Sequence, residues 1–144
     1  VGLLSVVNLT GSYSSPKAGA LTSKFGRGPV LTVSILIMLI GLLITLFAPL
    51  TTIFIGMMLF TAGFFAAHSV ASSWIGRRAR RAKGQASSLY LFCYYVGSSV
   101  AGTLGGVFWN NYGWNGIVLF LSVMLVLALW ISRALKRLPE AKRI

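Results

Sequence analysis

Two long segments of the sequence carry no charged side chain. Residues 28–76 and residues 84–132 contain no Asp, Glu, Lys or Arg, and both consist mainly of apolar residues. A helix that crosses a hydrocarbon core of about 30 Å needs about 20 such residues. Each segment is therefore long enough for two membrane-crossing helices joined by a short turn, and the stretch before Pro16 predicts a fifth.

Turn-forming residues set the limits of these five predicted helices. Pro16 is expected to end the first one, because proline has no N–H for the helix ladder, and a basic loop is expected over residues 17–28. Residues 48–52 predict a tight turn after the second helix, and the polar and aromatic residues 109–115 predict one after the fourth. The expected spans are residues 1–15, 29–47, 53–76, 84–108 and 116–132.

The predicted helices differ in side-chain size. The second and the fifth are bulky and aliphatic nearly all round, which is typical of helices that face lipid. In the fourth, Ser98, Gly102 and Gly106 recur every four residues, and such a ladder lets two membrane helices approach closely. Close packing explains this ladder better than contact with a solute. A similar stripe in the third helix consists of Gly56, Gly63, Ala67 and Ala71.

The third predicted helix also carries a polar face with aromatic neighbours. At about 100° per residue, Thr61, His68 and Ser72 fall on one face, with Phe64 and Phe65 beside them. Such a mixed face suits a cavity for an amphipathic solute. His68 is the only ionisable side chain deep within any predicted span, which favours a function for it. The alternative, a neutral histidine hydrogen-bonded to a neighbouring helix, remains open.

Charged residues are concentrated outside the apolar segments. The chain has 13 Lys and Arg residues, the single acid Glu140 and a formal net charge of +12. Since basic residues collect in cytoplasmic loops, we expect all three basic clusters and the C-terminus to lie in the cytoplasm. The apolar composition leaves no soluble domain for nucleic-acid binding. The clusters are Lys17, Lys24 and Arg27; Arg77, Arg78, Arg80, Arg81 and Lys83; and Arg133, Lys136, Arg137, Lys142 and Arg143.

Several kinds of chemistry lack the residues they require. No predicted span contains a carboxylate, and the chain has one histidine and one cysteine, which excludes paired-acid catalysis and a metal centre built by this chain alone. A phosphate-binding loop is also missing. We therefore expect neither an enzyme nor a cofactor. Cys93 is expected to be a small packing residue, and the start at Val1, inside an apolar stretch, is expected of a fragment.

The first predicted loop contains a motif of a known transporter family. Residues 19–28 read G-A-L-T-S-K-F-G-R-G, which resembles the G-x-L-a-D-R-x-G-R-[RK] loop motif of the major facilitator superfamily. Ser23 stands where the motif has its acid, and Gly28 stands where it has a base. The resemblance implies a cytoplasmic gate loop formed by Gly19, Lys24, Gly26 and Arg27.

Longer stretches resemble the tenth and eleventh helices of bacterial inner membrane transporters in this superfamily. They are residues 63–76, 83–90, 102–109 and 112–114. The resemblance covers essentially the whole chain. It implies an all-α membrane protein whose five transmembrane helices correspond to helices eight to twelve of a twelve-helix fold. The partner of this part would be the missing N-terminal half of the same protein.

The resemblance also implies a function. Transporters of this superfamily bind a small-molecule substrate near the midplane between two halves that rock about it, and their tenth helix lines that cavity. The implied protein is a monomeric, multi-pass efflux antiporter of the bacterial cell inner membrane, coupled to protons and surrounded by membrane lipids. An uncoupled facilitator or channel, and a non-transporting truncated membrane protein, remain open. The implied substrate-binding residues are His68, Thr61, Phe64, Phe65, Ser72 and Tyr95.

Overall fold

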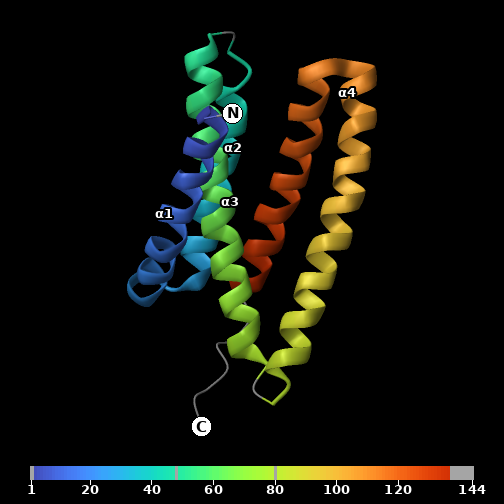
Figure 1. Cartoon of the computed structure of the whole chain (residues 1–144). Coiled ribbons are helices and arrows are strands. Elements are labelled where there is room, and N and C mark those ends of the chain that lie inside the picture. Colours follow the sequence, from blue (N-terminus) through green and yellow to red (C-terminus); the bar gives the residue numbers. More distant parts are fainter. Residues whose placement is uncertain (1, 48, 80, 137–144) are drawn as a thin grey trace.

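The computed structural model describes residues 2–47, 49–79 and 81–136, and within these ranges the chain forms helices and no strands. In chain order they are α1 (Gly2–Phe25), α2 (Arg27–Ile44), α3 (Leu50–Arg78) and α4 (Lys83–Lys136). They run side by side as a bundle (Figure 1). The all-α fold predicted from the sequence is confirmed.

The longest element, α4, consists of two helical segments joined by a sharp bend at Gly113. The backbone there has φ +62° and ψ −150°, which glycine adopts without the steric cost that a Cβ would bring. Figure 1 shows the two parts of α4 running antiparallel on either side of the bend. They correspond to the fourth and fifth predicted helices. The predicted turn over residues 109–115 is too long, because the chain stays helical up to Tyr112.

The first helix, α1, continues well beyond its predicted end. It includes Pro16 and ends at Phe25, so the predicted loop over residues 17–28 is wrong. A proline removes a single backbone donor from the helix ladder, and membrane helices tolerate that loss. The chain turns instead at Gly26, whose positive φ of 82° is readily adopted by glycine, and α2 begins directly after it.

The described basic residues gather at one end of the bundle. Figure 1 shows the α1–α2 junction, the α3–α4 junction and the end of α4 at the bottom, with the other two turns at the top. The lower junctions carry Lys24, Arg27, Arg78 and Lys83, and Arg133 lies near the end of α4. The charge distribution is therefore one-sided, as predicted. Arg80 and the basic residues after Lys136 lie outside the described residues.

Three segments of the described chain are long and apolar enough to cross a membrane. They are Arg27–Ile44, Leu50–Arg78 and Lys83–Leu135, and the last one includes both parts of α4. The latter part of α1 carries Lys17 and Lys24, and α1 does not meet the same criterion. The predicted membrane character is therefore supported by three of the four elements.

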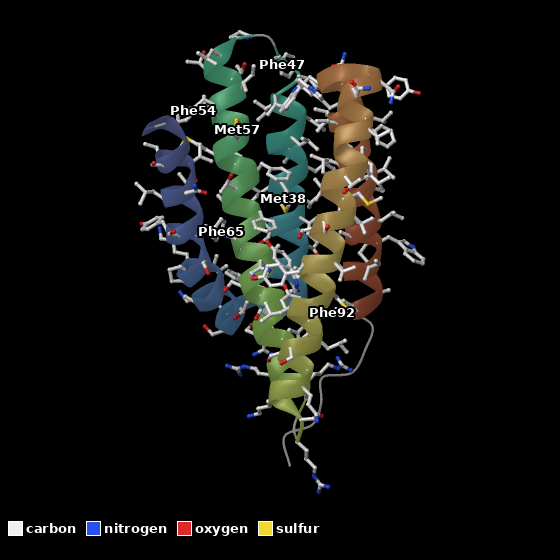
Figure 2. The ribbon with its side chains drawn as sticks, turned by 45° about the vertical axis from the view of Figure 1, so that its right-hand side comes forward. Met38, Phe47, Phe54, Met57, Phe65 and Phe92 are labelled. Atoms are coloured by element: carbon white, nitrogen blue, oxygen red, sulfur yellow. The ribbon has the colours of Figure 1, made fainter. Side chains whose placement is uncertain are left out.

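The second helix, α2, packs against all three other helices. One of its faces is buried and the opposite face is exposed, so the helix faces outward over less of its circumference than its aliphatic composition predicts. Its buried face includes glycine, serine and threonine residues, which are few among the aliphatic residues of this helix. The buried residues include Leu31, Thr32, Ser34, Gly41, Leu42 and Met38, the last of which is labelled in Figure 2.

Glycines bring α2 and α3 into backbone contact. A Cβ added at Gly41 would lie 2.7 Å from the carbonyl oxygen of Gly56, and one added at Gly56 would lie 2.5 Å from that of Gly41. At Gly63, an added Cβ would lie 2.7 Å from Cγ of Met38. Small residues allow this approach, as they do at many membrane helix interfaces. The small stripe predicted on the third helix is thus confirmed at its two glycines.

A buried pair of hydroxyl groups joins α2 to the returning part of α4. Oγ1 of Thr32 and Oγ of Ser132 lie 3.0 Å apart, and both side chains are buried. The Thr32 hydroxyl also donates to the carbonyl oxygen of Gly28 at 2.9 Å. Because each hydroxyl has one proton, Ser132 donates within the pair whenever Thr32 donates to Gly28.

We expect Ser132→Ala to lower the free energy of unfolding by about 1 kcal/mol, since it removes a buried interhelical hydrogen bond. Thermal unfolding in detergent, followed by circular dichroism, measures the change. Ser12→Ala is the matched control, because the Ser12 hydroxyl is exposed and bonds only to Asn8 of its own helix. Equal unfolding temperatures for the two variants would contradict a contribution from the pair.

Candidate functional site

Aromatic and histidine side chains meet where α3 faces the first part of α4. Phe64 and His68 are four residues apart on α3, and Tyr90 and Tyr94 are four residues apart on α4. Residues at this spacing lie on the same helix face, so each helix contributes two rings to the contact. All four side chains are half-buried. We call these four residues the histidine cluster.

His68 contacts every other member of the cluster. Its Nδ1 lies 2.9 Å from the Tyr90 hydroxyl oxygen. Its ring centroid lies 4.8 Å from that of Tyr94 and 5.5 Å from that of Tyr90. Phe64 stacks on the imidazole with the centroids 6.0 Å apart and an angle of 16° between the planes. The imidazole is therefore positioned by one hydrogen bond and three aromatic rings.

This arrangement uses only one nitrogen of the imidazole. Among the described residues no side chain or backbone group is hydrogen-bonded to Nε2 of His68. A neutral imidazole has one donor and one acceptor nitrogen, so Nε2 is a donor when Tyr90 donates to Nδ1 and an acceptor when Nδ1 donates. The hydrogen bond to a neighbouring helix, considered as one interpretation of His68, is present. It leaves Nε2 available for a solute or a proton.

The other predicted substrate-binding residues surround the cluster to different degrees. Tyr95 adjoins it through Tyr94, at 5.3 Å between ring centroids, and is 65% exposed. Thr61 is half-buried and Ser72 is exposed. Neither of these hydroxyls has a hydrogen-bond partner in the part of the chain that the structure describes. The structure thus brings Phe64 and His68 into direct contact and leaves Thr61, Ser72 and Tyr95 at the periphery.

Phe65 lies on a different side of α3. Its ring occupies the space beside Gly11 of α1, where an added Cβ would overlap with it, and Figure 2 shows Phe65 on the α1 side of α3. It meets Phe64 edge-on with the centroids 5.7 Å apart. Phe65 therefore packs α1 onto α3 and is separated from the imidazole.

Sequence reasoning alone misses Tyr90 and Tyr94. A signal is present in the run Tyr90-Leu91-Phe92-Cys93-Tyr94, where two hydroxyl-bearing rings share one helix face. Which face of α4 meets α3 depends on the rotation of α4 about its axis. No local pattern gives that rotation, so the partners of His68 emerge only from the fold.

The four residues of the predicted gate loop do not form a loop. Gly19 and Lys24 are helical residues of α1, Gly26 is the single connector, and Arg27 is the first residue of α2. The Nε atom of Arg27 is buried and has no hydrogen-bond partner within the described residues. The glycine-rich motif therefore corresponds to one tight turn between two helices.

The small-residue ladder on α4 has no partner helix among the described residues. Ser98, Gly102 and Gly106 are exposed, and a Cβ added at either glycine would meet no atom within 4 Å. Cys93 is exposed as well, so it packs against no helix in the described part of the chain. The ladder thus differs from the Gly41–Gly56 contact, where small residues do bring two helices together.

The sequence is similar to membrane transporters over its whole length. The family described as Major Facilitator Superfamily matches residues 1–144. The chain is 68% identical to the inner membrane transport protein YnfM of Escherichia coli (strain K12) over 137 residues, which cover 95% of this chain and 33% of that protein. It is 48% identical to the uncharacterized MFS-type transporter YybF of Bacillus subtilis (strain 168) over 132 residues, which cover 92% of this chain and 33% of that protein.

A further relative is the uncharacterized transporter BU588 of Buchnera aphidicola subsp. Acyrthosiphon pisum, with 52% identity over 95% of this chain and 33% of that protein. The chain spans about a third of the length of these curated relatives. No solved structure matches it. The family match and the apolar helices place the chain among membrane transport proteins and not among enzymes. It belongs to the major facilitator superfamily.

Proposed function

We propose that this chain is part of a secondary active transporter that exports a small solute across the bacterial inner membrane, coupled to inward proton flow. The observation that carries the proposal is His68. It is the only histidine of the chain, it lies within an apolar helix, and one of its ring nitrogens has no hydrogen-bond partner among the described residues. Ionisable residues within membrane helices are costly and mark solute or proton pathways. The family and its inner membrane relative favour the same assignment.

In this proposal α1 to α3 and the two parts of α4 are helices eight to twelve of a monomeric twelve-helix fold. Each curated relative is about three times as long as the matched stretch, since that stretch covers 33% of it. The basic end of the bundle, with the C-terminus, then lies in the cytoplasm. The exposed ladder of Ser98, Gly102 and Gly106 packs against a helix of the N-terminal half, which accounts for small residues on an open surface.

The histidine cluster suits an amphipathic solute with an apolar or aromatic part. The rings of Phe64 and Tyr94 offer apolar surface, and Nε2 of His68 offers one hydrogen bond. The described residues include no Asp or Glu, so His68 is the residue among them to which we assign a part in proton coupling. Alternating access exposes the cluster to each side of the membrane in turn.

The test is transport by the intact protein in reconstituted vesicles, with and without a pH gradient. We expect at least one member of a panel of amphipathic solutes to accumulate against its concentration gradient only while the pH gradient is maintained. If a solute crosses the membrane at the same rate with and without the pH gradient and does not accumulate, the protein is an uncoupled facilitator instead. No movement of any solute by correctly folded protein would favour a non-transporting membrane protein.

We expect Tyr90→Phe to slow transport by about fivefold, because it keeps the ring but removes the hydroxyl that positions Nδ1 of His68, a loss of about 1 kcal/mol. The measurement is the initial transport rate per amount of protein in the vesicles. Tyr112→Phe is the matched control, since Tyr112 is 70% exposed near the bend in α4 and lies outside the cluster. Equal rates for the two variants would rule out a role for the Tyr90 hydroxyl.

A further inference from the structure

An open groove runs between α1 and α2, away from the histidine cluster. Its walls come from residues 10–25 of α1 and residues 29–37 of α2, and its volume is about 630 Å³, within the range of ligand sites. Ala62, Gly63 and Ala66 of α3 form its floor. Their small side chains leave the space between the two outer helices unfilled.

The serine and threonine hydroxyl groups in the groove are already engaged. Thr10, Ser14 and Ser34 donate to backbone carbonyl oxygens at 2.6, 2.9 and 2.8 Å. The side chains of Tyr13 and Lys17 are the lining groups that still offer a proton, so a polar solute along the rest of the groove would lose hydration without replacement. The groove offers an apolar surface, which fits a hydrocarbon chain.

Positive charge accompanies the part of the groove near the basic end of the bundle. Lys17 lines the groove, and its Nζ lies 4.2 Å from the centroid of the Tyr13 ring. Lys24 and Arg27 follow toward the same end, and the buried Nε of Arg27 lacks a partner among the described residues. The described part of the chain contains no Asp or Glu side chain that could neutralise these cations. An apolar groove with cations at one end complements an anionic lipid.

We propose that the groove binds an acyl chain of an anionic phospholipid whose phosphate contacts Lys17. With the phosphate at Lys17, the groove follows α1 from Lys17 to Thr10 for about 10 Å at 1.5 Å per residue, and the hydrocarbon of one leaflet is about 15 Å deep. The groove thus accommodates about two thirds of one acyl chain, and the headgroup lies toward Phe25 at the basic end. Nζ of Lys17 lies over the Tyr13 ring, and a rotation of this long, flexible side chain turns the ammonium group toward the phosphate.

The test uses the intact purified protein, stripped of lipid and mixed in detergent with phosphatidylglycerol or phosphatidylethanolamine. Native mass spectrometry counts the lipids retained. We expect preferential retention of phosphatidylglycerol, and we expect Lys17→Ala to reduce that preference about fivefold, the effect of one basic residue at an anionic surface. Lys83→Ala is the matched control, because Lys83 is exposed at the same end of the bundle and does not line the groove.

A second pair of variants tests the groove itself. Val33 is exposed and lines the groove, whereas Leu43 is exposed on the same helix outside it. We expect Val33→Trp to fill the groove and to abolish retention of the preferred lipid, and Leu43→Trp to leave it unchanged. Equal retention of both headgroups by the unchanged protein, or equal retention by Lys17→Ala and Lys83→Ala, would overturn the proposal. The proposal would also be overturned if the unchanged protein retained no lipid and Val33→Trp disrupted folding. That result would indicate that a protein helix covers the groove.

Discussion

The His68→Ala variant is expected to transport its solute about tenfold more slowly than the unchanged protein while reaching the membrane in the same amount. The substitution removes Nε2, which has no partner within the described part of the chain, and leaves the Tyr90 hydroxyl without its partner at 2.9 Å. Loss of a hydrogen-bonding group from a half-buried site costs about 1–3 kcal/mol, and a cost of about 1.4 kcal/mol, in the lower part of that range, corresponds to tenfold in rate. Initial transport rates in vesicles, divided by the amount of protein, measure the effect.

A matched control separates this effect from general damage to α3. Ser73 lies on the same helix, is exposed, and bonds only to the backbone of Val70. Ser73→Ala should therefore keep the full rate. Normal abundance and an unchanged rate in His68→Ala would show that His68 is a packing residue, and a parallel loss in both variants would show that α3 tolerates no change.

The Gly41→Leu variant is expected to lose about 3 kcal/mol of stability or more and to reach the membrane in much smaller amounts. Even the Cβ atom would lie 2.6 Å from the backbone nitrogen of Phe60 and 2.7 Å from the carbonyl oxygen of Gly56. Both atoms belong to the backbone of α3 and not to a flexible side chain that could move aside, so α2 and α3 must separate. Overpacking of this kind costs about 1–3 kcal/mol and sometimes more.

Thermal unfolding in detergent and the amount of protein in the membrane fraction measure this loss. Gly76→Leu is the control, because a Cβ added at Gly76 of α3 would meet no atom within 4 Å. Its unfolding temperature should stay close to that of the unchanged protein. Equal unfolding temperatures for the two leucine variants would mean that α2 and α3 do not approach through Gly41.

The presence of the helices and the gathering of the basic residues at one end of the bundle were predictable from the sequence, because both depend on local composition. Charge-free segments over residues 28–76 and 84–132 leave few alternatives to membrane helices. The exact ends were harder to predict. Pro16 lies inside α1, because one missing donor does not break a membrane helix, and a single glycine, Gly113, reverses α4 where a longer turn was expected.

The candidate site was predictable only in part. His68 stands out in the sequence because it is the one ionisable residue within an apolar helix. Its partners Tyr90 and Tyr94 were missed, since they depend on the rotation of α4 against α3. Phe64 and Phe65 look equivalent in sequence, yet they point to α4 and α1 respectively. Adjacent residues on a helix are about 100° apart, so the neighbouring helices decide which one joins the site.

The most direct test of the solute path is protection of a single cysteine by a transported solute. Ser72 and Ser73 are adjacent, both are exposed, and only Ser72 belongs to the predicted face of His68. Each is changed to cysteine in intact protein whose native cysteines, including Cys93, have been replaced by serine. We expect a solute identified in the vesicle screen to slow maleimide labelling of Ser72→Cys and to leave that of Ser73→Cys unchanged. Equal labelling of Ser72→Cys with and without the solute would contradict a solute path along this face of α3.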